Sequence, residues 1–302
     1  MMTTLHEYLE SAGCETDLCT LIELIAEQAQ PIREAFITHQ AYAESENVYG
    51  ERQAAMDTWS DELITRVLGE SGLVRALSSE EQDEVRTFPG AKAEYAVVMD
   101  PMDGSSLIQT NLAVGTIVGI FGGGDVLQPG RDLKAALYML YGPMTTLTLT
   151  VGKGVCIFAM DHGGVYRLLE RDVRIPDGNL YGTGGGRPDW IDQHAAFITA
   201  VEADGAKLRY TGSYVADFHQ ILKYGGIYCY PALKGKPKGK LRLLYEAIPV
   251  GFIAAQAGGA ITDGHMDLLD LKPAEPHQRT PIYVGSMNMI GLVKETFERS
   301  RV

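Results

Sequence analysis

The stretch YAVVMDPMDGSSLI, residues 95–108, constrains the fold more than any other part of the chain. It is an apolar run typical of a buried strand, and it ends in Asp100 and Asp103. A charge at the end of a buried strand is costly unless a cation or hydrogen bonds compensate it. Two aspartates three residues apart are usually a solvated turn, but the buried character of the strand before them favours a metal site.

Small residues follow the second aspartate at once, as Gly104, Ser105 and Ser106. Together with Pro101, the glycine fixes the turn and leaves the backbone accessible. Backbone N–H groups in such a turn can point at an anion. We therefore expect the carboxylates to hold a metal ion while the Gly-Ser-Ser amides contact a phosphate.

A second acidic stretch, SSEEQDE at residues 78–84, contains Glu80 and Glu81. Taken alone it is typical of a solvated acidic surface. Combined with DPMDGSS it becomes the second arm of an all-oxygen site, the ligand set that Mg2+ prefers.

A third stretch places Lys240 and Arg242 just before Glu246, at the start of an apolar helix. By themselves the two basic residues could belong to a basic loop. Beside the acidic residues they suit a site in which metals and cations share the charge of two phosphates.

The pattern of apolar residues predicts the elements around these motifs. Residues 17–37 have apolar residues at three- and four-residue spacing, which predicts a helix that Pro31 bends or restarts, and a second helix is expected at 57–68. Between residues 95 and 152, short Val, Ile, Leu, Thr and Tyr runs broken by glycine predict a mostly antiparallel sheet.

The second half of the chain has a different character. Residues 173–190 are rich in glycine and are expected to form a long loop that links two domains. Helices and strands then alternate, which predicts an α/β half: helices near 189–203, 213–223 and 245–257, and strands near 207–210 and 225–232. The expected division is into residues 1–175 and 176–302.

Composition excludes several classes of protein. The net charge of −13 argues against a nucleic-acid-binding surface, because clustered Lys and Arg supply that affinity. The first residues do not resemble a targeting peptide, and no segment reaches the roughly 18 apolar residues of a membrane span. We expect a cytoplasmic protein, or an organellar one if a transit peptide has been removed. Cys14 and Cys19 are either a redox pair or two packed thiols.

Three stretches occur in order: DPMDGSS, LRYTGSYVADFHQILKYGGIYCYPA and GKLRLLYEAIPVGFIAAQAGG. On these residues the chain resembles the class I fructose-1,6-bisphosphatase and sedoheptulose-1,7-bisphosphatase family, within the lithium-sensitive phosphatase superfamily. The resemblance implies an α/β (α+β) fold, a layered α-β-α-β-α sandwich. It also implies an N-terminal half that binds metal, a C-terminal half that contacts the sugar and distal phosphate, and a homodimer or homotetramer.

The resemblance further implies a set of site residues and a cofactor. Two or three Mg2+ ions per subunit, or Mn2+, would be held by Glu80, Glu81, Asp100, Asp103, Glu246 and the carbonyl of Met102. Asp57 and Glu81 would orient and deprotonate the attacking water. The substrate would be contacted by Asp103, Gly104, Ser105, Ser106 and Arg242 at the 1-phosphate, by Lys240, Tyr210 and Tyr230 at the sugar and distal phosphate, and by Arg209 from a neighbouring subunit.

The expected substrate is sedoheptulose 1,7-bisphosphate, hydrolysed by metal-activated water to sedoheptulose 7-phosphate and phosphate. Fructose-1,6-bisphosphatases usually carry Asn-Glu-Gly where this chain has three glycines, 184–186. Small residues there would leave room for one more carbon, and Arg187 would replace the lost phosphate contact. Tyr230, in contrast, is typical of the fructose enzymes, so fructose-1,6-bisphosphatase or dual specificity is the alternative. A remote alternative is a catalytically silent metabolite sensor.

Overall fold

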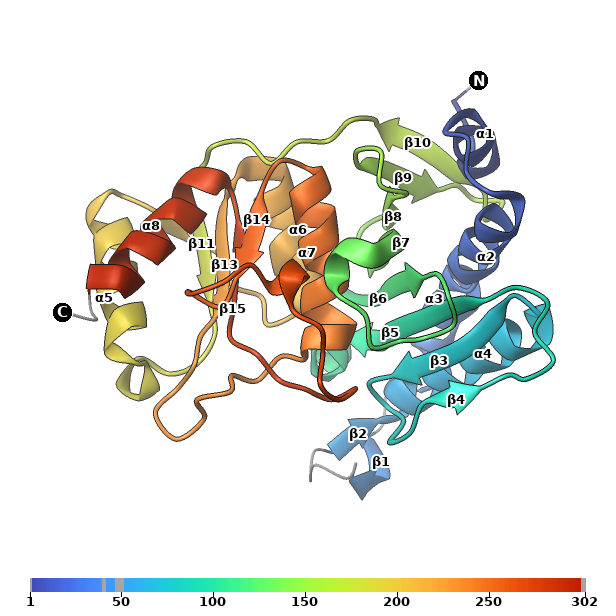
Figure 1. The fold of residues 1–302 in the computed structure, drawn as a ribbon, viewed down its shortest axis with the longest axis horizontal. Helices are drawn as coiled ribbons and strands as arrows, with labels where there is room; N and C mark the ends of the chain where they lie inside the picture. Colours follow the sequence, from blue (N-terminus) through green and yellow to red (C-terminus); the bar gives the residue numbers. More distant parts are fainter. Residues whose placement is uncertain (1, 40–41, 47–51, 300–302) are drawn as a thin grey trace.

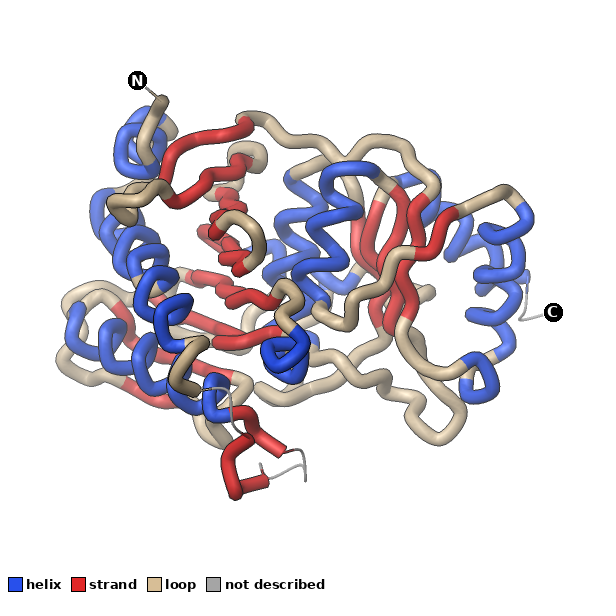
Figure 2. Tube along the Cα trace, turned by 180° about the vertical axis from the view of Figure 1, so that it is seen from behind, coloured by secondary structure: helices blue, strands red, loops and turns tan. Residues whose placement is uncertain are grey.

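The computed structural model describes residues 2–39, 42–46 and 52–299. In these residues two β-sheets alternate with three layers of helices, as Figures 1 and 2 show from opposite sides. The helices outside the larger sheet are α1 (Leu5–Ser11), α2 (Thr16–Glu27), α3 (Ala29–Ala35) and α4 (Ala55–Ser71). Between the sheets lie α6 (Tyr214–Tyr224) and α7 (Ile248–Gln256), and outside the smaller sheet lie α5 (Asp192–Ala203) and α8 (Met287–Arg299). The predicted five-layer sandwich is confirmed.

The larger sheet has eight strands in the order β10-β9-β8-β7-β6-β5-β3-β4. Its strands are β3 (Val74–Ser79), β4 (Arg86–Thr87), β5 (Tyr95–Asp103), β6 (Val114–Phe121), β7 (Leu133–Tyr141), β8 (Thr145–Thr150), β9 (Cys156–Met160) and β10 (Tyr166–Glu170). Neighbours are antiparallel except β3 and β5, which confirms the antiparallel sheet predicted for residues 95–152. Helices cover both faces, so β5 and β6 are buried throughout and read as continuous apolar runs.

The smaller sheet has the order β12-β11-β13-β15-β14. Its strands are β11 (Leu180–Thr183), β12 (Lys207–Leu208), β13 (Gly226–Tyr230), β14 (Ala260–Thr262) and β15 (Ile282–Gly285). A separate antiparallel pair consists of β1 (Tyr42–Glu46) and β2 (Arg52–Ala54). The larger sheet uses residues 74–170 and the smaller one residues 180–285, while the division into domains at residue 175 stays a prediction.

One predicted loop was wrong in part. Within residues 173–190 the chain forms β11 and a short 3-10 helix, Arg187–Asp189. Strand β11 pairs in parallel with β12 and β13, which come later in the sequence. A four-residue strand containing a glycine has no alternating pattern of its own, so only these long-range pairings reveal it.

The helices confirm the predicted pattern with shifted ends. The helix predicted at 17–37 is broken at Gln28 into α2 and α3, and Pro31 lies in the first turn of α3, where its missing N–H costs no hydrogen bond. Helix α7 follows a π-helical turn, Leu243–Ala247. Among the described residues, no helix combines the length and apolar character that a membrane span requires.

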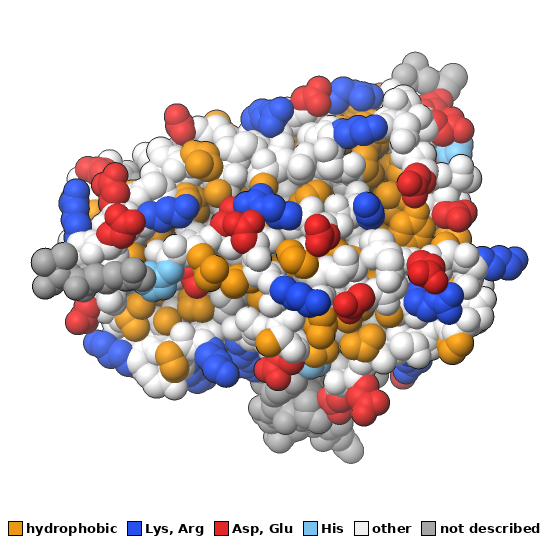
Figure 3. Space-filling view, in the orientation of Figure 1, with side chains coloured by type: hydrophobic (Ala, Val, Ile, Leu, Met, Phe, Trp, Pro, Cys, Tyr) orange, Lys and Arg blue, Asp and Glu red, His pale blue; other side chains and the backbone are white. Residues whose placement is uncertain are grey.

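The charge distribution on the surface agrees with the expectation drawn from the net charge. On the face drawn in Figure 3, Lys and Arg side chains are interspersed with Asp and Glu, and the described residues form no broad basic patch there.

Burial and the neighbouring Cys19 thiol raise the pKa of Cys14 to about 12. Because the thiolate is the reactive form, this favours two packed thiols over a redox pair.

Gly115 in β6 allows a close approach between the larger sheet and α6. A Cβ at this position would lie 2.5 Å from the Met139 carbonyl oxygen and 2.6 Å from Val215 Cγ1. We predict that Gly115→Ala lowers the free energy of unfolding by about 1–3 kcal/mol, because backbone must shift. Gly291→Ala in α8, where a Cβ meets open space, should instead raise it by about 0.5–1 kcal/mol. Equal melting temperatures for the two variants would contradict this account.

Candidate active site

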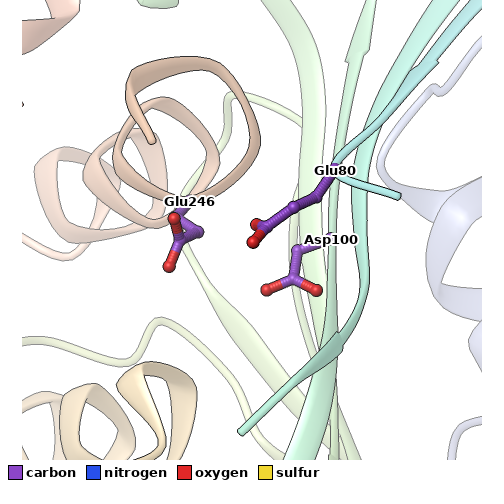
Figure 4. Close-up of side chains that lie close together, drawn as sticks. All are labelled: Glu80, Asp100 and Glu246. Atoms are coloured by element: carbon purple, nitrogen blue, oxygen red, sulfur yellow. The ribbon is translucent and has the colours of Figure 1, made fainter. Parts of the chain in front are cut away.

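Three carboxylates converge where the two halves of the molecule meet. Glu80 follows β3, Asp100 lies in β5, and Glu246 lies in the π-helical turn before α7. One oxygen from each lies within 4.8 Å of the others, and Figure 4 shows the three side chains close together. Residues separated by up to 166 positions in sequence thus form one acidic centre.

The backbone fixes these carboxylates. Strands β3 and β5 are parallel neighbours in which Ser79 pairs with Met99, so Glu80 follows beside Asp100. The N–H of Glu80 donates to the Met99 carbonyl at 3.0 Å. The N–H of Arg242 donates to the Glu246 carboxylate at 2.6 Å, which holds that side chain toward the strands. The position of the Glu246 carboxylate therefore depends on the π-helical turn.

Negative charge on the three clustered carboxylates is unfavourable unless a positive charge compensates it. Burial is the main cause that raises the pKa of Glu80 and Asp100 well above their usual values, and repulsion between the carboxylates adds to it. Burial also raises the pKa of Glu246 to about 7. The Arg242 guanidinium donates to Glu80 and lowers both glutamate pKa values, but it does not cancel the burial.

The cluster fits a hard divalent cation such as Mg2+. All its donors are carboxylate oxygens, which is the chemistry Mg2+ prefers. In addition, Glu80 Oε2 is buried and has no hydrogen-bond partner among the residues described. Glu80, Asp100 and Glu246 would hold the ion.

Asp103 has a different environment from the other carboxylates. Its oxygens accept hydrogen bonds from Ser213 Oγ at 2.6 Å, from Val215 N at 2.9 Å and from Tyr214 N at 3.2 Å. Asp103 therefore joins β5 to the N-terminus of α6. Its role as a metal ligand stays a prediction.

Gly104 serves the same junction. It has φ +79°, and a Cβ there would lie 2.7 Å from Ser213 Cβ. The glycine thus lets α6 approach the turn, a packing role that the sequence interpretation, centred on phosphate contact, did not include. The following 3-10 helix, Ser105–Thr110, begins at a cavity that Ser105 and Ser106 line, so the amides of its first turn are available to an anion.

Most predicted site residues line one cavity of about 340 Å³. Besides the three clustered carboxylates, these are Asp57, Glu81, Met102, Asp103, Gly104, Ser105, Ser106, Tyr210, Tyr230, Lys240 and Arg242. Ser105 Oγ donates to Asp57 at 3.1 Å, and Lys240 Nζ lies 5.8 Å from the centre of the Tyr230 ring.

The cavity also contains residues that the sequence interpretation missed, namely Gly212, Tyr214, Tyr228 and Leu241. Tyr228 and Tyr230 are two apart in β13 and so share a face of the sheet, a signal that could have identified Tyr228. The rings of Tyr210 and Tyr228 are stacked with centroids 6.4 Å apart.

Two predicted substrate residues do not line this cavity. Arg187 lies over the Trp190 ring and 3.8 Å from the Glu202 carboxylate, on an exposed surface. In this structure Arg187 thus lies beside α5 and not in the cavity lining, and its predicted contact with the distal phosphate stays a prediction. The exposed Arg209 bonds the Leu208 carbonyl, and its predicted reach into a neighbouring subunit stays a prediction.

The glycines at 184–186 do not leave an open space. A Cβ on Gly184 would overlap the ring of Tyr230, and one on Gly185 would lie 2.7 Å from the Leu233 side chain. Trp190 Nε1 donates to the carbonyls of Gly184 and Gly185 at 3.2 Å. The expected room for an additional substrate carbon is thus filled by Tyr230.

Comparisons with known proteins agree with this site. Residues 2–171 match the family model of the fructose-1-6-bisphosphatase N-terminal domain, and residues 175–298 match that of the C-terminal domain. The class 1 fructose-1,6-bisphosphatase of Methanocorpusculum labreanum is 57% identical over 97% of this chain and 91% of the relative. That of Methanospirillum hungatei is 53% identical over 98% and 96%.

A solved structure supports the same assignment. The holo form of Leishmania major fructose-1,6-bisphosphatase superposes with a TM-score of 0.94 at 31% identity, covering 99% of this chain and all of that one. Fold and site together define a phosphoric monoester hydrolase that acts on a sugar bisphosphate. The chain belongs to the class 1 fructose-1,6-bisphosphatase family.

The buried carboxylates predict how stability depends on pH without metal. Since the pKa of Glu246 is raised from 4.5 to about 7, the folded protein binds this proton more tightly than the unfolded chain. Stability should then fall as pH rises through that interval. We predict that the melting temperature of chelator-treated protein drops between pH 5 and pH 8, and that Mg2+ added at pH 8 restores it. Glu246→Gln should weaken the dependence, part of which Glu80 and Asp100 retain because their pKa values are also raised. A variant as pH-sensitive as the parent protein would refute a contribution from Glu246.

Proposed function

We propose that the protein hydrolyses the 1-phosphate of fructose 1,6-bisphosphate to fructose 6-phosphate and phosphate, with Mg2+ as the cofactor. The observation that carries the proposal is the largely buried cluster of Glu80, Asp100 and Glu246, in one cavity with Arg242 and the turn after Asp103. Such a site suits a phosphate that is contacted by metal and cations together.

The chemistry needs strong assistance, since phosphate monoester hydrolysis is so slow that enzymes accelerate it by up to about 10^21-fold. Bound Mg2+ would stabilise charge on the phosphate and lower the pKa of a water. Asp57 and Glu81 line the cavity and are proposed to orient that water and take its proton. The hydrogen bond from Ser105 Oγ keeps the Asp57 carboxylate directed into the cavity.

The rest of the cavity suits the sugar and the distal phosphate. Lys240 lies at the Tyr230 ring, and Tyr210 stacks on Tyr228, so cations and aromatic faces form one wall. Lys240 and Arg242 would offset the repulsion that a protein of net charge −13 exerts on a bisphosphate.

The substrate preference is assigned to fructose over sedoheptulose bisphosphate. The similar proteins carry the fructose-1,6-bisphosphatase name, and the Tyr230 ring fills the space over Gly184. These two findings favour the alternative raised from Tyr230 over the expectation based on the glycines. A homodimer or homotetramer, with Arg209 reaching across, and a cytoplasmic location are part of the proposal.

The substrate assignment is tested by phosphate release from both bisphosphates in one preparation. We expect kcat/KM to be at least tenfold higher for fructose 1,6-bisphosphate, about 1.4 kcal/mol of transition-state preference. Chelation should abolish the activity and Mg2+ should restore it. A preference for sedoheptulose 1,7-bisphosphate would reinstate the rejected substrate, and chelator-resistant activity would exclude the metal.

A second test addresses the contact between Gly184 and Tyr230. Gly184→Ala should displace the tyrosine ring and raise KM for fructose 1,6-bisphosphate about tenfold, a loss of about 1.4 kcal/mol in binding. Gly186→Ala is the matched control, because its Cβ would lie no closer than 3.4 Å to any neighbour. If both variants keep the parent KM, the ring position does not determine affinity.

A further inference from the structure

A buried carboxylate behind the cavity joins α4 to the loop that carries Glu80 and Glu81. Asp61 in α4 accepts from Gln82 Nε2, which lies 2.8 Å from Oδ2 and 3.1 Å from Oδ1. The same nitrogen lies 2.9 Å from Thr65 Oγ1, one turn further along α4. The Gln82 side chain thus hydrogen-bonds to two successive turns of α4, and Gln82 directly follows Glu80 and Glu81 in the chain.

Asp61 also contacts Ser79, the residue that precedes Glu80 and Glu81. Ser79 donates a hydrogen bond to the Asp61 carboxylate, and Ser79 Oγ accepts from the N–H of Glu81 at 3.3 Å. Both residues that flank Glu80 and Glu81 are therefore held by one carboxylate.

The loop is fixed from the opposite half of the molecule as well. His277 Nε2 donates to the carbonyl of Gln82 at 2.9 Å, since a carbonyl can only accept. Gln82 is thus held through its side chain by α4 and through its backbone by the segment before β15. The loop has little freedom to move relative to either.

The position of Asp61 in α4 gives these contacts a functional meaning. Asp57 and Asp61 are four residues apart, so they lie on the same side of the helix in successive turns. One turn directs Asp57 into the cavity, and the next holds the loop that carries Glu81. The Asp61–Gln82 contact therefore joins the two elements that carry the proposed proton acceptors.

We propose that Asp61 and Gln82 are positioning residues that fix Asp57 relative to Glu81 for deprotonation of the attacking water. This inference rests on the proposed function. A buried carboxylate is an expensive way to pack a helix against a loop, because apolar residues of similar size pack without desolvating a charge. An error of about 1 Å in such a constellation can cost on the order of 100-fold in rate.

The site tolerates the substitutions that test this proposal. A hollow of about 360 Å³ adjoins the pair, lined among others by Asp61, Thr65, Gln82 and Phe88, so exchanges of similar size need not overpack the interior. Gln82→Glu places two carboxylates opposite each other, whereas Asp61→Asn keeps one acceptor oxygen for Gln82 and removes the charge and the second acceptor. The double variant restores one donor and one acceptor with their positions exchanged and keeps the net charge.

The experiment measures kcat and KM for fructose 1,6-bisphosphate, with Mg2+, together with melting temperatures. Gln82→Glu should lose at least tenfold in kcat with KM within threefold of the parent, and the double variant should recover most of that loss. Asp61→Asn should lose less, because its amide oxygen still accepts from Gln82. Glu62→Gln, which removes a charge from the exposed face of α4 next to Asp61, should leave both constants unchanged.

Several results would overturn the proposal. Singles that melt earlier but keep the parent kcat would show a structural contact only, and a double variant no better than the worse single would exclude the pairing. If the parent protein releases no phosphate from fructose 1,6-bisphosphate, the proposed function fails and this inference falls with it. An active parent with unaffected single variants overturns the inference alone.

Discussion

The crowding of three carboxylates, two buried and one partly buried, in one small volume is the constraint on which the rest of the site depends. Glu80, Asp100 and Glu246 lie in a region where charge is poorly solvated, and their raised pKa values reflect that cost. Arg242 offsets part of it. The remaining electrostatic cost would be offset by the proposed divalent cation, so the same arrangement that is unfavourable without metal would favour binding it.

The second aspartate of DPMDGSS shows how the two halves are held together around that cluster. Asp103 accepts three hydrogen bonds from the start of α6, and Gly104 permits the close approach. Helix α6 lies between the sheets (Figure 1), so this junction ties the turn after β5, which lines the cavity, to that middle layer. The cavity wall from Tyr210 to Tyr214 follows directly from it.

Much of the fold could be predicted from local patterns, and the exceptions share a cause. Strands β5 and β6 are buried on both faces and are evident as apolar runs. Strand β11 was missed because its four residues acquire their strand character only from β12 and β13. The same holds for the glycines at 184–186, whose small size reflects Tyr230 and Leu233 packing against them.

The sequence by itself determined the chemistry: the acidic pairs at the ends of apolar runs, the basic residues before Glu246, and the family they identify together. These features are local, since neighbouring residues fix both the groups and their spacing. Only the tertiary structure decided which groups meet. It turned Arg187 toward Glu202, placed Tyr228 beside Tyr210, and set Asp61 against Gln82. Such contacts join segments far apart in the chain, and no local pattern encodes a distance across the fold.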